Sequence, residues 1–183
     1  MRYEIRASGF FKKEYLISEF FGVAKYIAKN DFWSDGAKMS LQNVQGEQLA
    51  SIEEDDSSRQ WHHYKIFVGE QLFAHLKDVS TRKWYEYGTL GSSFILDVPG
   101  PDDYTIEVVS GWISKHNFIR NGKTVAHTSF PHLIASLFSL FSLSSKKLVM
   151  TVEIEPGEEE IAILCTCLAF VKSHEDARRR KHY

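Results

Sequence analysis

The chain has 183 residues, of which 43% are hydrophobic and 25% are charged. This composition is typical of one globular domain, so we expect a single domain over 1–183 and exclude a wholly disordered chain. The net charge of −2 excludes a global basic field, and we expect no nucleic-acid partner.

The amino-terminal residues are charged and lack the apolar core of a signal peptide. The two cysteines, Cys165 and Cys167, are too few for a disulfide framework, which favours a reducing compartment. We therefore expect a cytoplasmic protein that is either free or peripheral to a membrane.

Glycine-centred turns recur along the chain. Gly46-Glu47-Gln48-Leu49-Ala50 and Gly69-Glu70-Gln71-Leu72-Phe73 share one pattern, and Asn121-Gly122-Lys123-Thr124-Val125-Ala126 repeats it. Apolar and polar residues alternate on both sides of each turn, and period two with Gly at the turn is typical of β-hairpins. The pattern predicts hairpins at 14–29, 37–54, 62–78, 93–109 and 115–130.

The segment 131–145 breaks this alternation. An apolar helical face is predicted there by the spacing of Leu133, Ile134, Leu137, Phe138 and Phe141. Two interpretations stay open: the segment packs on its own domain, or it forms an apolar patch for a membrane surface or for a second copy of the chain through 133–143. Lys146 and Lys147 follow immediately and could reach anionic headgroups.

A last strand is predicted at Lys147–Glu155, and a further piece around Lys83–Tyr87 brings the total to eleven or twelve strands. Closing into a barrel removes the edges of so many antiparallel strands, and about twelve strands leave a hole in the middle.

The chain then supplies a plug for that hole. The acidic residues 158–160 suit the start of a helix, and Ile161–Val171 is apolar at almost every position around the axis. We therefore expect a mainly β fold, a closed antiparallel barrel of about 12 strands around a central, hydrophobic C-terminal helix that spans Glu158–His174. The apolar run is shorter than a membrane span, so burial in the barrel is favoured over a tail anchor.

The chain ends in a basic tail, 178–183. It contains Arg178, Arg179, Arg180 and Lys181, and without these four the chain has 18 Lys and Arg against 24 Asp and Glu. The tail is either a membrane-facing electrostatic patch or a solvated helix end.

The serial hairpins and the terminal apolar helix together resemble the tubby-like C-terminal superfamily, within its LURP-one-related and phospholipid-scramblase-like branch. The likeness covers about 12–172. It implies a closed barrel around a central helix, and membrane-linked or interaction roles such as phosphoinositide binding or lipid scrambling. The chain has no match to the palmitoylated cysteine cluster or the calcium-binding segment of scramblases.

Residues whose side chains could take part in catalysis or metal binding are scattered along the sequence. Cys165 and Cys167 point about 200° apart on a helix, the histidines lack zinc-ligand spacing, and the acidic run 53–56 is typical of a solvated turn. We expect no catalytic residue, no metal and no cofactor.

The sequence favours a non-enzymatic module that binds anionic phospholipid or phosphoinositide, or a protein. A structural, oligomer-forming role and a small-ligand enzyme remain the alternatives. The residues expected to bind lipid or a partner are Leu133, Ile134, Leu137, Phe138, Phe141, Lys146, Lys147, Arg178, Arg179, Arg180 and Lys181.

Overall fold

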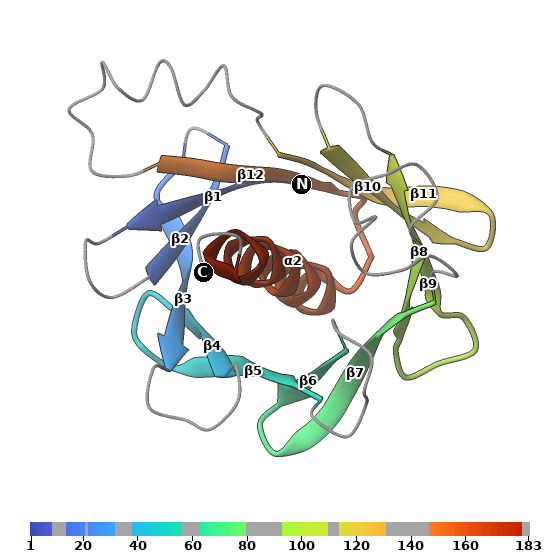
Figure 1. Cartoon of the computed structure of the whole chain (residues 1–183), viewed down its shortest axis with the longest axis horizontal. Helices are drawn as coiled ribbons and strands as arrows, with labels where there is room; N and C mark the ends of the chain where they lie inside the picture. The colour runs from blue at the N-terminus through green and yellow to red at the C-terminus, as the bar shows by residue number, and fades with distance from the viewer. Residues whose placement is uncertain are drawn as a thin grey trace.

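The structure is a computed structural model that describes residues 1–8, 14–20, 22–31, 38–55, 63–79, 93–109, 114–130 and 147–180. Twelve antiparallel strands form a closed barrel, and one long helix lies inside it (Figure 1). The predicted mainly β fold is therefore confirmed. The elements are β1 (Arg2–Ser8), β2 (Glu14–Glu19), β3 (Ala24–Asp31), β4 (Lys38–Asn43), β5 (Gln48–Glu54), β6 (Tyr64–Val68), β7 (Gln71–Asp78), β8 (Ser93–Asp97), β9 (Tyr104–Val109), β10 (Ser114–Arg120), β11 (Lys123–Phe130), β12 (Lys147–Ile154) and α2 (Glu160–Arg180).

Each strand of the barrel pairs with its neighbours in the sequence, and the ring closes where β1 pairs with β12. All five predicted hairpins are present, with boundaries that differ by only a few residues. The strand that completes the ring is β1, which the sequence analysis did not predict. The piece around Lys83–Tyr87 lies outside the described residues.

The tight turns explain the recurrent glycines. Asn121 and Gly122 have φ values of 53° and 72°, and this pair of left-handed residues joins Arg120 to Lys123 as a type I′ turn requires. At the turn between β6 and β7, Gly69 alone has a positive φ, 61°, which fits the first central position of a type II′ turn.

The helix forms the centre of the core. Every residue from Ala162 to Val171 is buried, and the inward side chains of all twelve strands pack around this stretch. The helix runs to Arg180, six residues beyond the predicted end at His174. It continues past the buried core, since Lys172 and Ser173 are only half-buried.

The two open ends of the barrel differ in their connections. We call one end the turn mouth, where the short connections 20–23, 44–47, 69–70, 98–103 and 121–122 lie and where 155–159 leads into the helix. At the opposite end, the loop mouth, strand ends are joined by 9–13, 32–37, 55–63, 79–92, 110–113 and 131–146. The helix enters at the turn mouth and points toward the loop mouth, because Glu160 contacts Tyr26 beside the first and Phe170 contacts Phe94 beside the second.

Candidate functional site

Some of the predicted binding residues lie in the described part of the chain, in β12 and at the end of α2, and the others lie outside it. Lys147 opens β12 at the loop mouth, and Arg178, Arg179 and Arg180 form the end of α2 on the same side. The remaining members lie outside the described residues, and their roles stay predictions: Leu133, Ile134, Leu137, Phe138, Phe141, Lys146 and Lys181.

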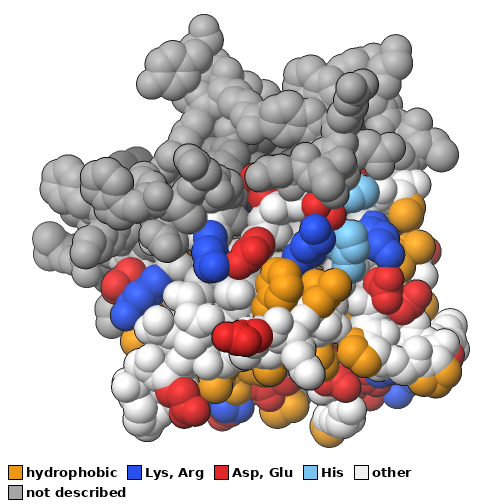
Figure 2. All heavy atoms as spheres, turned by 90° about the horizontal axis from the view of Figure 1, so that it is seen from below, with side chains coloured by type: hydrophobic (Ala, Val, Ile, Leu, Met, Phe, Trp, Pro, Cys, Tyr) orange, Lys and Arg blue, Asp and Glu red, His pale blue; other side chains and the backbone are white. Residues whose placement is uncertain are grey.

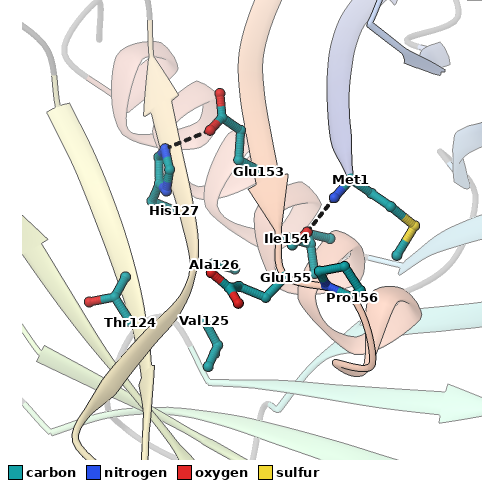
Figure 3. A pocket seen from close by; sticks show the side chains of 9 residues that line it. All are labelled: Met1, Thr124, Val125, Ala126, His127, Glu153, Ile154, Glu155 and Pro156. Atoms are coloured by element: carbon teal, nitrogen blue, oxygen red, sulfur yellow. Dashed lines mark hydrogen bonds and ion pairs between the residues drawn. The ribbon is translucent and has the colours of Figure 1, made fainter.

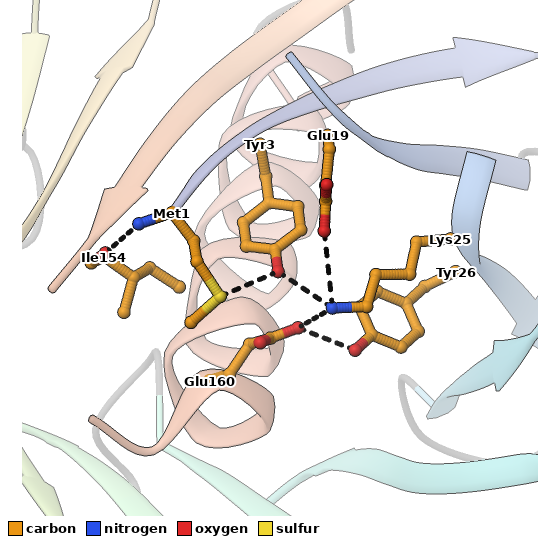
Figure 4. Close-up of polar contacts among 7 residues, drawn as sticks. All are labelled: Met1, Tyr3, Glu19, Lys25, Tyr26, Ile154 and Glu160. Atoms are coloured by element: carbon orange, nitrogen blue, oxygen red, sulfur yellow. Dashed lines mark hydrogen bonds and ion pairs between the residues drawn. The ribbon is translucent and has the colours of Figure 1, made fainter. Parts of the chain in front are cut away.

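At the turn mouth, a polar cluster fastens the start of the helix to one wall of the barrel. The hydroxyl of Tyr26 donates a hydrogen bond to Glu160 Oε1 over 2.6 Å. Lys25 Nζ donates to the same oxygen and to the hydroxyl of Tyr3, both over 3.1 Å (Figure 4). Because β1 and β3 supply these partners, we call this cluster the Lys25 clamp.

A second cluster, the Arg120 clamp, holds Glu158, two residues before the helix begins. The hydroxyl of Tyr104 donates to Glu158 Oε2 over 2.7 Å, and Arg120 donates to that hydroxyl over 3.1 Å. The guanidinium also lies 3.4 Å from Glu158. Since β9 stands six places from β3 in a ring of twelve, the two clamps grip the helix from opposite walls.

Electrostatics favour the neutral phenols in both clamps and the charged carboxylate of Glu160 in the Lys25 clamp. Burial raises the pKa of Tyr3 to about 12, and burial together with Glu158 raises the pKa of Tyr104 to about 12. Burial alone would raise the pKa of Glu160, but hydrogen bonds from Tyr26, Tyr3 and Lys25 outweigh it and hold that pKa below its ordinary value. The clamps are therefore ion pairs fixed by neutral tyrosines, with no proton positioned for transfer at neutral pH.

A third polar cluster lies on the outer wall near the loop mouth. The buried carboxylate of Asp55 accepts a hydrogen bond from Lys65 over 3.0 Å, and its other oxygen lies 3.3 Å from His75 Nε2. His63 stands edge-on to His75, with ring centroids 6.1 Å apart. On this wall, histidine side chains lie among lysines and acidic residues close to the grey atoms of the loop mouth (Figure 2).

The imidazole of His75 is poorly solvated. Within the described part of the chain, its Nε2 and that of His63 are buried without a well-aligned hydrogen bond. Burial, and then the charge of Lys77, lower the pKa of His75 against the opposing pull of Asp55. Residues 55, 63, 65 and 75 therefore form a polar contact between the ends of β5, β6 and β7, in which His75 favours its neutral form.

A cleft of about 300 Å³ opens between β11 and β12 (Figure 3). Its lining combines apolar side chains with those of Thr124, His127, Glu153 and Glu155. Glu153 lies 3.1 Å from His127, and Glu155 lies 3.0 Å from Lys123, which is outside the lining. The cleft therefore presents no free acid–base pair for catalysis.

The remaining residues that could act as nucleophiles or bases are part of the core. Burial raises the pKa of the Cys165 thiol to about 12 and also raises that of Cys167, so neither thiol is reactive at neutral pH. His116 stacks on Phe170 at 4.4 Å and shares a hydrogen bond with Thr128. Among the described residues, no group of three His, Cys, Asp or Glu side chains is placed to hold a metal ion.

Sequence reasoning missed all three polar clusters. Lys25 and Glu160 are 135 residues apart, and only the register of the closed barrel brings them together. The acidic start of the helix was recognised, but as a partner for the helix dipole. The buried Asp55 was expected to be solvated, as part of the run 53–56. Cross-strand registry that places Lys65 opposite His75 is the signal that could have corrected this expectation.

The structure has no described helix long and apolar enough to cross a bilayer. In comparisons with protein-family models, with curated proteins and with solved structures, none matched the chain. The resemblance to the tubby-like superfamily therefore stays a prediction.

Proposed function

We propose that this chain is a non-enzymatic binding domain that docks, loop mouth first, on an anionic phospholipid surface. The supporting observation is the opposite charge of its two ends. The connections of the turn mouth contain seven carboxylates and neither lysine nor arginine. The residues joined at the loop mouth, with 172–183, contain eleven lysines and arginines against six acids.

The densest part of this positive charge lies at the end of α2. The buried stretch ends at Val171, and at about 1.5 Å per residue the backbone of Arg179 lies about 12 Å further along the helix axis. Cations on this part of the helix would meet an anionic surface that approaches the loop mouth. Each cation near an anionic surface contributes about 1 kcal/mol, and the attraction decays within a Debye length of about 10 Å.

The helix inside the barrel supports a binding function over a catalytic one. Ala162–Val171 packs against every wall, so along this stretch the barrel interior is occupied by the chain itself. A small-ligand enzyme built inside the barrel would need that space. A role in oligomer formation through 133–143 stays a prediction, because this segment lies outside the described residues.

Co-sedimentation with phosphatidylcholine vesicles that contain phosphatidylserine tests the proposal. The variant R178Q/R179Q/R180Q removes three charges from the helix end. We expect its binding to fall by about one to two powers of ten at low salt, and the binding of the parent to weaken as salt is added.

The control is R2Q/K123Q, which removes positive charge from two exposed ion pairs at the turn mouth, Arg2–Glu153 and Lys123–Glu155. Such pairs contribute about 0–1 kcal/mol each to stability, so this variant should fold. We expect its vesicle binding to stay within about threefold of the parent. Equal losses in both variants would contradict end-on docking, and a parent without affinity for these vesicles would refute the proposed function.

A further inference from the structure

The turn mouth has a feature that lipid binding at the opposite end does not use. Three hairpin tips that are consecutive around the ring each expose an aliphatic side chain to solvent. Val23 is 89% exposed between β2 and β3, Val44 is 50% exposed between β4 and β5, and Leu72 is 52% exposed just after the turn between β6 and β7. Val68 adds to the third tip at 41%.

Carboxylates accompany these side chains at each tip. Glu19 lies beside the first tip, Glu47 beside the second and Glu70 beside the third. Glu19 has only a long contact of 3.6 Å with Lys25, and no described cation pairs with Glu47 or Glu70. Figure 2 shows orange and red side chains, with some blue ones between them, along the edge opposite the grey atoms.

The other half of the same rim is different. Its connections, 98–103, 121–122 and 155–159, carry Asp102, Asp103 and a run of glutamates, and the one large hydrophobic side chain exposed beside them among the described residues is Met1, at 47%. The apolar tips are therefore a localised patch, which we call the acidic–aliphatic rim and define by Val23, Val44, Val68 and Leu72 with Glu19, Glu47 and Glu70.

We infer that the acidic–aliphatic rim binds a basic amphipathic segment of a partner protein, in which lysines or arginines flank apolar side chains. The charge of the rim selects this occupant. Carboxylates repel an anionic membrane, and a symmetric dimer through this face would set the carboxylates of two copies against each other. A basic amphipathic segment instead buries the aliphatic tips and pairs with the surrounding glutamates.

This inference does not depend on lipid binding, because the two surfaces lie at opposite ends of the barrel. A domain with both properties would connect an anionic surface to a basic protein.

Fluorescence anisotropy with two labelled peptides, in the absence of lipid, tests the inference. One is a short helical peptide of leucine and lysine with an apolar face, and the other replaces its leucines by serine at equal charge. We expect the parent to bind the leucine–lysine peptide about tenfold more tightly than the serine–lysine peptide. In V23S/V44S/L72S this preference should disappear, and in E47Q/E70Q the affinity for both peptides should fall.

The chain provides a matched control at the other mouth. Val79 and Val109 are 44% and 40% exposed beside the loop mouth, so V79S/V109S removes similar aliphatic surface without touching the rim. We expect it to keep the parent's preference.

Three results would overturn the inference. The first is equal affinity of the parent for both peptides, and the second is an unchanged preference in V23S/V44S/L72S. The third is loss, in that variant, of self-association or of binding to phosphatidylserine vesicles, which would assign the rim to a second copy or to lipid.

Discussion

Single polar groups fix where the helix stands in the barrel and how the outer wall responds to acid. Glu160 and Glu158 hold the helix start through the hydroxyls of Tyr26 and Tyr104, and Asp55 holds together the ends of three strands at the opposite mouth. Each of these carboxylates is wholly or largely shielded from water. Such groups depend on their partners, because a shielded charge without one is costly.

The position of His75 predicts a stability that depends on pH near neutrality. Its folded-state pKa lies below the ordinary value of 6.5, so the unfolded chain binds the proton more readily. The free energy of unfolding should therefore decrease as pH falls from about 7.5 to about 5.5. Urea titrations of the parent and of His75→Gln should show a smaller decrease for the variant.

The control for this experiment is Gln48→Asn, which changes an exposed side chain without a titrating group at the start of β5. It should retain the parent's pH dependence. Identical slopes for the parent and His75→Gln would show that the contact with Asp55 does not couple stability to pH.

The clamp tyrosines predict a measurable cost for removing one hydroxyl. Tyr26→Phe and Tyr104→Phe each delete a hydrogen bond to a carboxylate, and each should lower the free energy of unfolding by about 1–3 kcal/mol. Because the clamps lie on opposite walls, the losses in the double variant should add to within about 0.5 kcal/mol. Denaturant unfolding of the four proteins measures this. Losses below about 0.5 kcal/mol in both single variants would mean that the clamps do not hold the helix.

At the scale of the elements, the helix and the strands depend on one another. The inward side chains of the barrel need an apolar surface to contact, and the helix needs cover on every side because its buried stretch has no polar face apart from Thr166. Thr166 itself donates its hydroxyl to the carbonyl of Ala162 one turn back, over 2.8 Å. Neither the barrel nor the helix has a core without the other.

This dependence predicts that one charge in the helix prevents folding. Leu164 is fully buried in the middle of the stretch, and Leu164→Asp would place a carboxylate where neither water nor a cation can compensate it. We expect no cooperative unfolding transition by circular dichroism. Ser173→Asp, two residues past the buried stretch, should fold like the parent. Soluble Leu164→Asp protein with a cooperative transition would exclude the helix as the core.

The sequence predicted those elements whose signals are local. Alternation and turn glycines located the hairpins, and an uninterrupted apolar run located the helix. The strand β1 carries the same alternation, since Tyr3, Ile5 and Ala7 are separated by charged residues, but it was considered only as a possible targeting segment. The contact of Lys25 with Glu160 depends on the ring register, which no local pattern encodes, whereas the contact of Asp55 with His75 also depends on the local pairing of β6 with β7.

At the scale of the whole molecule, the connections at the two ends of the barrel differ in charge. Those of the turn mouth carry carboxylates without lysine or arginine, and α2 ends on the side of the loop mouth with Arg178, Arg179 and Arg180 in its last turn. A charge separated along one axis orients the molecule in an external field before contact is made. The proposed lipid and protein surfaces use opposite ends of that axis, so both can be occupied in one orientation.

The place of the helix after the twelfth strand has a consequence for how the protein is made. A ribosome delivers the twelve strands first, and until residues 160–173 have left the exit tunnel the inner face of every hairpin has nothing to cover it. Hairpins can form locally within microseconds, whereas translation adds only about 5–20 residues per second. The apolar inner face of the nascent strands is therefore exposed for several seconds, and a chaperone would bind it during this interval.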